Sequence, residues 1–136
     1  MLFSKGTDYS ILIMGYLSSL TSNELKSKSQ ISEKLNLPRE FVSQLLQRLH
    51  NAGLIHAVRG RSGGYKLRTS PKNITLKDVV EAIDGKLQTV DCLSEHAKGC
   101  NRVGFCTPII KELYLLEEKI NKNLELINFS KMKVTV

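Results

Sequence analysis

The chain has 136 residues, of which 41% are hydrophobic and 24% are charged. This length suits one compact domain with an appendage and excludes a large multidomain enzyme. The composition excludes a wholly disordered chain and a collagen-like repeat. Three cysteines lie within one short stretch, and an odd number so placed fits ligation or redox chemistry in a reducing cytoplasm better than the paired bridges of a secreted protein.

The net charge of +7 is concentrated in one segment of the chain. Six basic side chains and no acidic one lie between Arg59 and Lys77. Such a density favours a polyanionic partner such as nucleic acid, provided that a binding motif flanks the same segment.

The apolar run from Ile11 to Leu17 is too short to span a bilayer. Asp8 precedes it, where a secretory signal would carry positive charge. We therefore expect a cytoplasmic protein with no membrane partner.

Three helices are predicted in the first part of the chain. Residues 7–20 carry an apolar face, and Thr7 or Asp8 can cap them. A short helix over residues 29–35 and a third over residues 39–51 follow. Two short helices joined by a tight turn, the second with polar side chains on its outer face, are typical of a helix-turn-helix whose second helix enters the major groove of DNA.

An arginine-rich hairpin is predicted after the third helix. Residues 54–58 and 65–68 have the character of strands, and residues 59–64 form the turn between them. Glycines in this turn allow the backbone to approach a phosphate or the minor groove, and Arg59 and Arg61 provide the cations. The pattern predicts a wing beside the helix-turn-helix.

The residues of this turn also match the Gly-x-Ser-x-Gly pattern of hydrolases, at Gly60 to Gly64. That chemistry requires a helix after the serine, whereas a strand is predicted here. We expect no enzymatic activity.

Two further helices complete the predicted architecture. Residues 75–84 form a capped amphipathic helix. From Pro108 to about Phe129, apolar side chains recur at close to heptad spacing, which favours packing against a second copy over docking on a domain that already has its own core. The predicted fold is mainly α with a small β wing. It comprises a winged helix-turn-helix domain (residues 1–85), a cysteine loop (86–107), and a dimerisation helix with a frayed tail (108–136).

The cysteine loop carries Cys92, Cys100 and Cys106. It lacks the Cys-x2-Cys pair of structural zinc and ferredoxin sites, and its wide gaps indicate a loop wrapped around something larger than one ion. Three soft ligands in a segment poor in apolar neighbours favour thiolates on iron or zinc over three buried free thiols.

The wing sequence from Arg59 to Tyr65, the preceding helix-turn-helix and the three cysteines together resemble the Rrf-type family of bacterial winged-helix regulators. The resemblance covers nearly the whole chain. It implies a homodimeric transcription factor, a repressor by expectation, whose cysteines hold an iron–sulfur cluster that senses nitric oxide, iron or redox state. It also implies a pseudo-palindromic DNA operator.

The fourth cluster ligand separates branches of this family. The histidine of the Isc-type branch is absent, because Ile109 stands three residues after Cys106. The segment around Asp8 resembles the branch in which an aspartate of the partner subunit completes a four-iron cluster, so a 4Fe-4S cluster is favoured over 2Fe-2S. His96 inside the loop is a weaker candidate. Two alternatives stay open, namely a structural zinc site and a metal-free thiol switch.

The predicted DNA contacts fall into two groups. Polar residues of the third helix are expected to read bases, and residues of the hairpin are expected to serve the wing and the DNA backbone. The first group is Arg39, Glu40, Ser43, Gln44 and Arg48, and the second is Arg59, Arg61, Gly63, Gly64, Tyr65 and Lys66.

Overall fold

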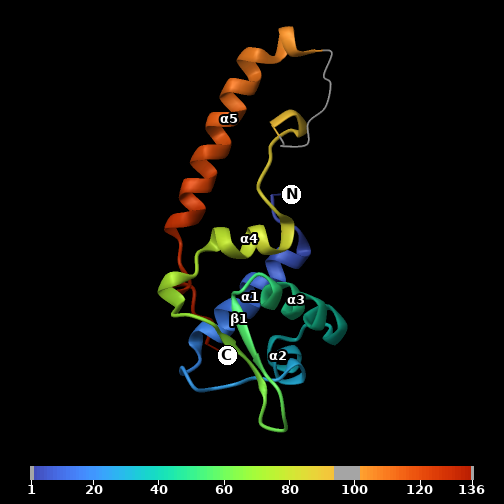
Figure 1. Ribbon diagram of the computed structural model, residues 1–136, viewed down its shortest axis with the longest axis vertical. Helices are drawn as coiled ribbons and strands as arrows, with labels where there is room; N and C mark the ends of the chain where they lie inside the picture. The colour runs from blue at the N-terminus through green and yellow to red at the C-terminus, as the bar shows by residue number, and fades with distance from the viewer. Residues whose placement is uncertain (1, 94–101, 136) are drawn as a thin grey trace.

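The computed structural model describes residues 2–93 and 102–135. Within them the chain forms five α-helices and one two-stranded antiparallel sheet, confirming the predicted fold class. The elements are α1 (Lys5–Ser19), α2 (Lys28–Leu35), α3 (Arg39–Asn51), β1 (Ile55–Val58), β2 (Gly64–Leu67), α4 (Leu76–Asp84) and α5 (Val103–Leu126), with short 3-10 helices at Pro71–Asn73, Asp91–Leu93 and Phe129–Lys131. Figure 1 shows the hairpin at one end of the molecule and α5 at the other, with α4 lying across the space between them.

The cap of α1 differs from the sequence prediction. The helix begins earlier than expected because the Ser4 side chain accepts a hydrogen bond from the Thr7 amide (3.1 Å) and so supplies the cap. Thr7 itself is fully buried, and Asp8 lies exposed in the first turn. Thr7 and Asp8 are therefore helical residues and not caps.

The helix-turn-helix forms as predicted, and α3 has the expected bounds. Ser27 begins α2 through a capping box with Gln30. Asn36 ends α2 in the left-handed conformation (φ 53°), and Gly53 (φ 77°) follows the end of α3. Ser27, Asn36 and Gly53 thus mark the ends of the two helices.

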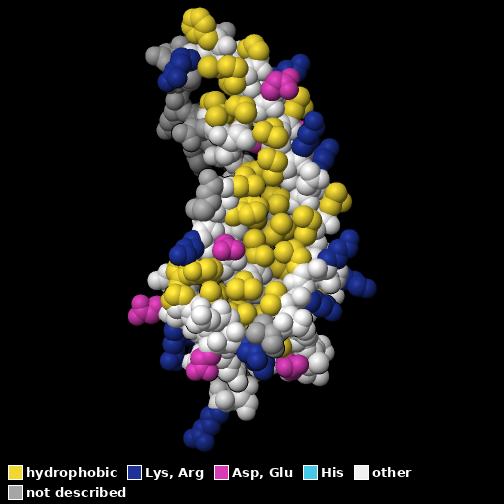
Figure 2. Space-filling view, turned by 180° about the vertical axis from the view of Figure 1, so that it is seen from behind, with side chains coloured by type: hydrophobic (Ala, Val, Ile, Leu, Met, Phe, Trp, Pro, Cys, Tyr) yellow, Lys and Arg dark blue, Asp and Glu magenta, His cyan; other side chains and the backbone are white. Residues whose placement is uncertain are grey.

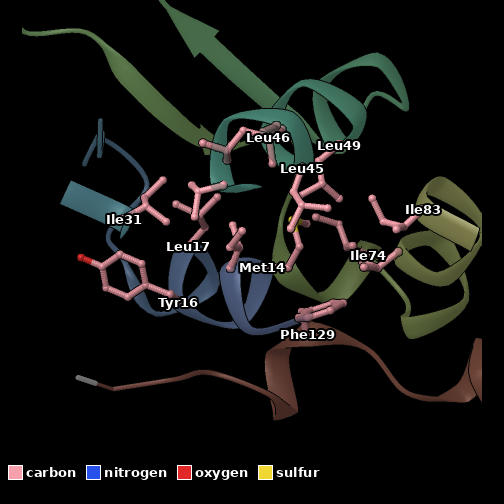
Figure 3. Close-up of a cluster of buried hydrophobic side chains, with 14 residues drawn as sticks. Met14, Tyr16, Leu17, Ile31, Leu45, Leu46, Leu49, Ile74, Ile83 and Phe129 are labelled. Atoms are coloured by element: carbon pink, nitrogen blue, oxygen red, sulfur yellow. The ribbon is translucent and has the colours of Figure 1, made fainter. Parts of the chain in front are cut away.

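The main core lies where α1, α3 and the end of α4 meet (Figure 3). Its side chains come from segments that are far apart in the chain, so the core ties the helix-turn-helix to the rest of the domain. Each large apolar side chain buried there contributes about 1.5–3 kcal/mol to stability. The fully buried members include Ile13, Met14, Ile31, Val42, Leu45, Leu46, Leu49, Ile55, Ile74, Val79 and Phe129.

The C-terminal segment is part of this core, contrary to the expectation of a frayed tail. Phe129 is fully buried, and its amide donates to the Ile74 carbonyl (3.0 Å). The Val134 amide donates to the Gly15 carbonyl (3.0 Å) on α1. The N-terminal residues therefore do not form a self-sufficient core, because the chain returns from α5 to complete it.

The wing is a two-stranded hairpin with an added pairing to the segment before α2. Tyr65 and Lys26 exchange two backbone hydrogen bonds, of 2.8 and 3.1 Å. A Cβ on Gly64 (φ 155°) would lie 2.7 Å from the Lys26 backbone, and one on Gly63 would lie 2.1 Å from the Val58 carbonyl oxygen. These two glycines are thus required by close approaches within the chain, before any approach to DNA is considered.

The long helix α5 begins at Val103, five residues before the predicted start, so Pro108 lies inside it. Its C-terminal end docks on α4, where Leu124 packs with Leu76 and Val80. Lys77 and Glu125 form an ion pair across the same contact (2.8 Å). Docking on the chain's own domain, the less favoured reading, therefore accounts for one end of the helix.

Candidate nucleic-acid interface and thiol site

An open groove lies between α3, the start of α2 and the wing. Its lining includes three basic side chains and one acidic one, so its local charge favours an anion. Arg39 and Glu40 in the first turn of α3 line the groove, and Pro38 supplies no side-chain cap to this helix. The lining residues are Ser27, Lys28, Arg39, Glu40, Ser43, His50, Ala57, Val58, Arg59, Gly60, Gly63, Gly64 and Tyr65.

Seven of the eleven residues predicted to contact DNA line this groove, and four do not. Gln44 is exposed on α3 and Arg61 is exposed near the hairpin tip, but neither borders the groove. Lys66 borders a different hollow, together with Arg68 and Lys133. The seven are Arg39, Glu40, Ser43, Arg59, Gly63, Gly64 and Tyr65.

Arg48 is directed away from the groove. Its guanidinium donates a hydrogen bond to the Ile83 carbonyl near the end of α4. The place of Arg48 on α3 predicts base reading when taken alone. The helix turns this position toward α4, so Arg48 joins the recognition helix to the domain.

Asp84 lies beside this contact and connects it to α1. The Ser4 amide donates to one carboxylate oxygen (3.0 Å), and the Ser4 hydroxyl donates to the other. Partial burial opposes ionisation of Asp84, but the hydrogen bonds from Ser4 and the positive charge of Arg48 outweigh it and lower the pKa of this carboxyl. The first turn of α1, the end of α4 and α3 thus meet at one carboxylate.

Lys28 lines the groove, although it precedes the helix predicted over residues 29–35 and is not among the residues predicted to contact DNA. Its ammonium donates to the Ser43 hydroxyl on α3 (3.2 Å). Periodicity within a single helix cannot show such a contact, because it joins the first residue of α2 to the middle of α3.

The described part of the cysteine segment holds two of the three thiols. Cys92 is exposed in the short turn Asp91–Leu93, and Cys106 is half-buried near the start of α5. Both are free thiols. Cys106 therefore lies on a helix, not in the predicted loop, while Cys100 and His96 lie outside the described residues. Within residues 2–93 and 102–135, no group of three potential metal ligands comes together.

The linker that carries Cys92 is anchored to α5 by a buried carboxylate. Glu117 is 8% exposed, and it accepts hydrogen bonds from the Thr89 hydroxyl (2.8 Å) and the Thr89 amide. Thr89 lies three residues before Cys92, and Glu117 lies on the helix that begins close to Cys106. This contact ties the segment before Cys92 to the middle of α5.

Apolar side chains remain exposed along much of α5. Phe105 is 85% exposed and Ile109 is 60% exposed, although both are large hydrophobic residues. Figure 2 shows hydrophobic side chains gathered in a band that runs from the upper end of the molecule past its middle. The exposed members on and just after α5 are Phe105, Ile109, Tyr114, Leu115, Leu116, Leu126 and Ile127.

These features define a winged-helix DNA-binding protein. Residues 3–134 match the model of the Rrf2 family, which is described as iron-dependent transcriptional regulators. The chain belongs to this family, and it is a transcriptional regulator and not an enzyme. Among the helices of residues 2–93 and 102–135, none combines the length and the hydropathy that a membrane span requires.

The chain is similar to several relatives and solved structures. The NsrR regulator of Halalkalibacterium halodurans is 26% identical over 121 residues, which cover 89% of this chain and 80% of that one. An rrf2-like regulator of Rhodobacter capsulatus is 35% identical over 68 residues, or 50% of this chain and only 45% of the relative. The solved structure of CymR, described as the global cysteine regulator of B. subtilis, superposes with a TM-score of 0.76 at 25% identity, covering 96% of this chain and 94% of that one.

Proposed function

We propose that the protein acts as a homodimeric repressor that binds a pseudo-palindromic operator in the groove between α3 and the wing. The observation that carries this proposal is the groove itself, in which the polar face of α3 and the wing residue Arg59 converge. Arg39, Ser43 and Glu40 line this groove. In the proposed complex Arg39 and Ser43 contact base edges in the major groove, and Glu40 accepts from a cytosine amino group. Arg59 on the wing serves the phosphate backbone or the minor groove.

The exposed apolar band of α5 supports the homodimer. A contiguous apolar surface of this kind on a small protein marks a contact site. A two-fold arrangement would pair the band with itself and present two copies of α3 to one operator. The exposed Leu116 and Ile109 are the side chains for which this pairing supplies the missing partner.

The donor set fits a soft metal centre. Cys92 and Cys106 are free thiols on the two flanks of one segment, and Cys100 lies between them in the sequence. Thiolates are the ligands that iron–sulfur clusters take up, and the family is described as iron-dependent. We propose that the three cysteines hold an iron–sulfur cluster, a 4Fe-4S cluster in preference to a 2Fe-2S one, which supplies sensitivity to nitric oxide, iron supply or redox state when bound.

The fourth ligand is proposed to be Asp8 of the partner subunit. Asp8 is exposed in the first turn of α1, so its carboxylate is accessible to a second chain. A carboxylate oxygen is a harder and weaker ligand for iron than a thiolate, so this corner would be the labile one. His96 is the less favoured candidate.

A metal-free thiol switch is the second candidate function. Cys92 is exposed and free, and a solved structure of similar fold, that of Staphylococcus aureus CymR, is described as an oxidized form. Exposed thiols are those open to oxidation or mixed-disulfide formation. The thiol-switch reading uses the same three cysteines without a cofactor, and a structural zinc site is a third use of them.

Anaerobic purification followed by iron, sulfide and zinc analysis separates these readings. The cluster proposal expects brown protein with iron and sulfide in equal amounts, lost together in the Cys92→Ser, Cys100→Ser and Cys106→Ser variants. Colourless protein that holds zinc tightly would contradict the cluster and support the structural zinc site. Metal-free protein that binds its operator only when reduced would support the thiol switch.

A further inference from the structure

Lys28 is placed to take part in base recognition with Ser43. It is the first residue of α2, and its ammonium lies 3.2 Å from the Ser43 hydroxyl oxygen on α3. Both residues line the groove. In a helix-turn-helix the first helix crosses the DNA backbone, and the second helix contacts the bases. Lys28 differs from this pattern, because it belongs to the first helix but its side chain reaches the base-contacting face of α3.

The hydrogen bond fixes the role of the Ser43 hydroxyl. An ammonium group can only donate, so Ser43 accepts from Lys28. The hydroxyl proton of Ser43 is then free to point into the groove, and Lys28 has two further N–H donors. The pair therefore presents two adjacent donors to a ligand in the groove.

Two adjacent donors match one base edge better than the others. In the major groove, guanine presents two neighbouring acceptors, O6 and N7, whereas adenine presents one acceptor and one donor. Cytosine presents a donor, which an ammonium cannot accept. We propose that Lys28 and Ser43 together read a guanine in each half-site, an inference that rests on the proposed DNA-binding function of the groove.

This assignment makes Lys28 a specificity residue and not a phosphate contact. A phosphate contact would strengthen binding to all sequences alike and would raise the salt dependence. A base contact instead changes the preference at one position of each half-site, by roughly fivefold or more.

The test begins with an operator selected by the wild-type protein from a random duplex library. Each guanine of that operator is then replaced singly by 7-deazaguanine, which lacks the N7 acceptor, and affinities are measured for wild type, Lys28→Met and Ser43→Ala. We expect one guanine per half-site at which the replacement weakens wild-type binding by roughly fivefold or more but leaves one of the two variants, the one that has lost the donor to N7, nearly unaffected. Lys34→Met, which removes an exposed lysine of α2 outside the groove, is the matched control and should behave as wild type.

The inference is overturned if Lys28→Met and Ser43→Ala both respond to every replacement as wild type does, or if Lys28→Met loses affinity equally for all duplexes. Arg59→Ala separates this failure from failure of the proposed function. If Arg59→Ala weakens operator binding while Lys28→Met leaves base preference unchanged, only the assignment of Lys28 is wrong. If the wild-type protein selects no sequence at all, the proposed function falls together with the inference.

Discussion

The helix-turn-helix unit and the long helix α5 differ in how far their apolar side chains are buried. In the helix-turn-helix unit, Leu46 and Leu49 are fully buried. On α5, Ile109 is 60% exposed and Leu116 is 46% exposed, although their spacing is as regular as that of the core residues. The difference indicates that the apolar side chains of the helix-turn-helix unit are packed within one chain, whereas those on the outer part of α5 depend on a second component for their burial.

The core substitution with the largest expected effect is Leu46→Ala. It removes a fully buried side chain from α3 and should lower the free energy of unfolding by about 2–5 kcal/mol, measured by urea denaturation. The matched change Leu116→Ala, at protein concentrations where the chain is monomeric, should cost less than about 0.5 kcal/mol. Equal losses would show that α5 is as fully packed in the monomer as the core.

A charge on the exposed band should weaken association between chains. Leu116→Glu places a carboxylate where the proposed dimer buries apolar surface, so we expect the dimer dissociation constant to rise at least about tenfold. Sedimentation equilibrium measures this shift, and Leu116→Met serves as the conservative control. An unchanged dissociation constant would remove this face of α5 from the interface.

Loss of the Glu117 carboxylate should loosen the linker before Cys92. Glu117→Leu leaves the Thr89 amide without its acceptor, so hydrogen exchange at that amide should accelerate about tenfold. Glu118→Leu is the control, because it removes only an exposed contact with the Tyr114 hydroxyl. If the two variants exchange alike at Thr89, the contact does not anchor the linker.

The smallest expected effect is the pH-dependent contribution of Asp84 to the free energy of unfolding. Its pKa is lowered in the folded state, so its stabilisation is present above the unfolded pKa of about 3.9 and is lost as pH falls through the folded pKa. Because the side chain is largely exposed, Asp84→Asn should cost only about 0.5–1 kcal/mol near neutral pH. Urea denaturation should show this difference shrinking below about pH 4, whereas a constant difference would contradict the charge-based origin.

Local signals predicted the helix-turn-helix and the wing well. The bounds of α3, the Thr75 cap of α4 and the hairpin of β1 and β2 all follow from short-range patterns. The predictions that failed concern contacts between segments that are distant in the chain. The burial of Phe129 against Ile74 and the turn of Arg48 toward Ile83 arise only after the chain has folded back on itself.

The residues of the candidate site were also predicted only in part. Arg59 and Ser43 were assigned to DNA contact from their elements, and the groove brings them together. Lys28 could not be found, because its contact with Ser43 depends on how α2 crosses α3. The heptad spacing on α5 predicted packing against a second copy, and this does not hold for the whole helix. Leu124 packs on the chain's own α4, whereas Leu116 remains exposed.

Control of DNA binding by the state of the cysteines is tested most directly by one anaerobic titration. A fluorescent duplex of the selected operator is titrated with iron-loaded protein, and again with the same protein after its iron has been removed. We expect the two affinities to differ by at least about tenfold, and the difference to vanish when Cys92, Cys100 and Cys106 are all replaced by serine. Equal affinities for the iron-loaded and iron-free protein would contradict an iron-dependent switch.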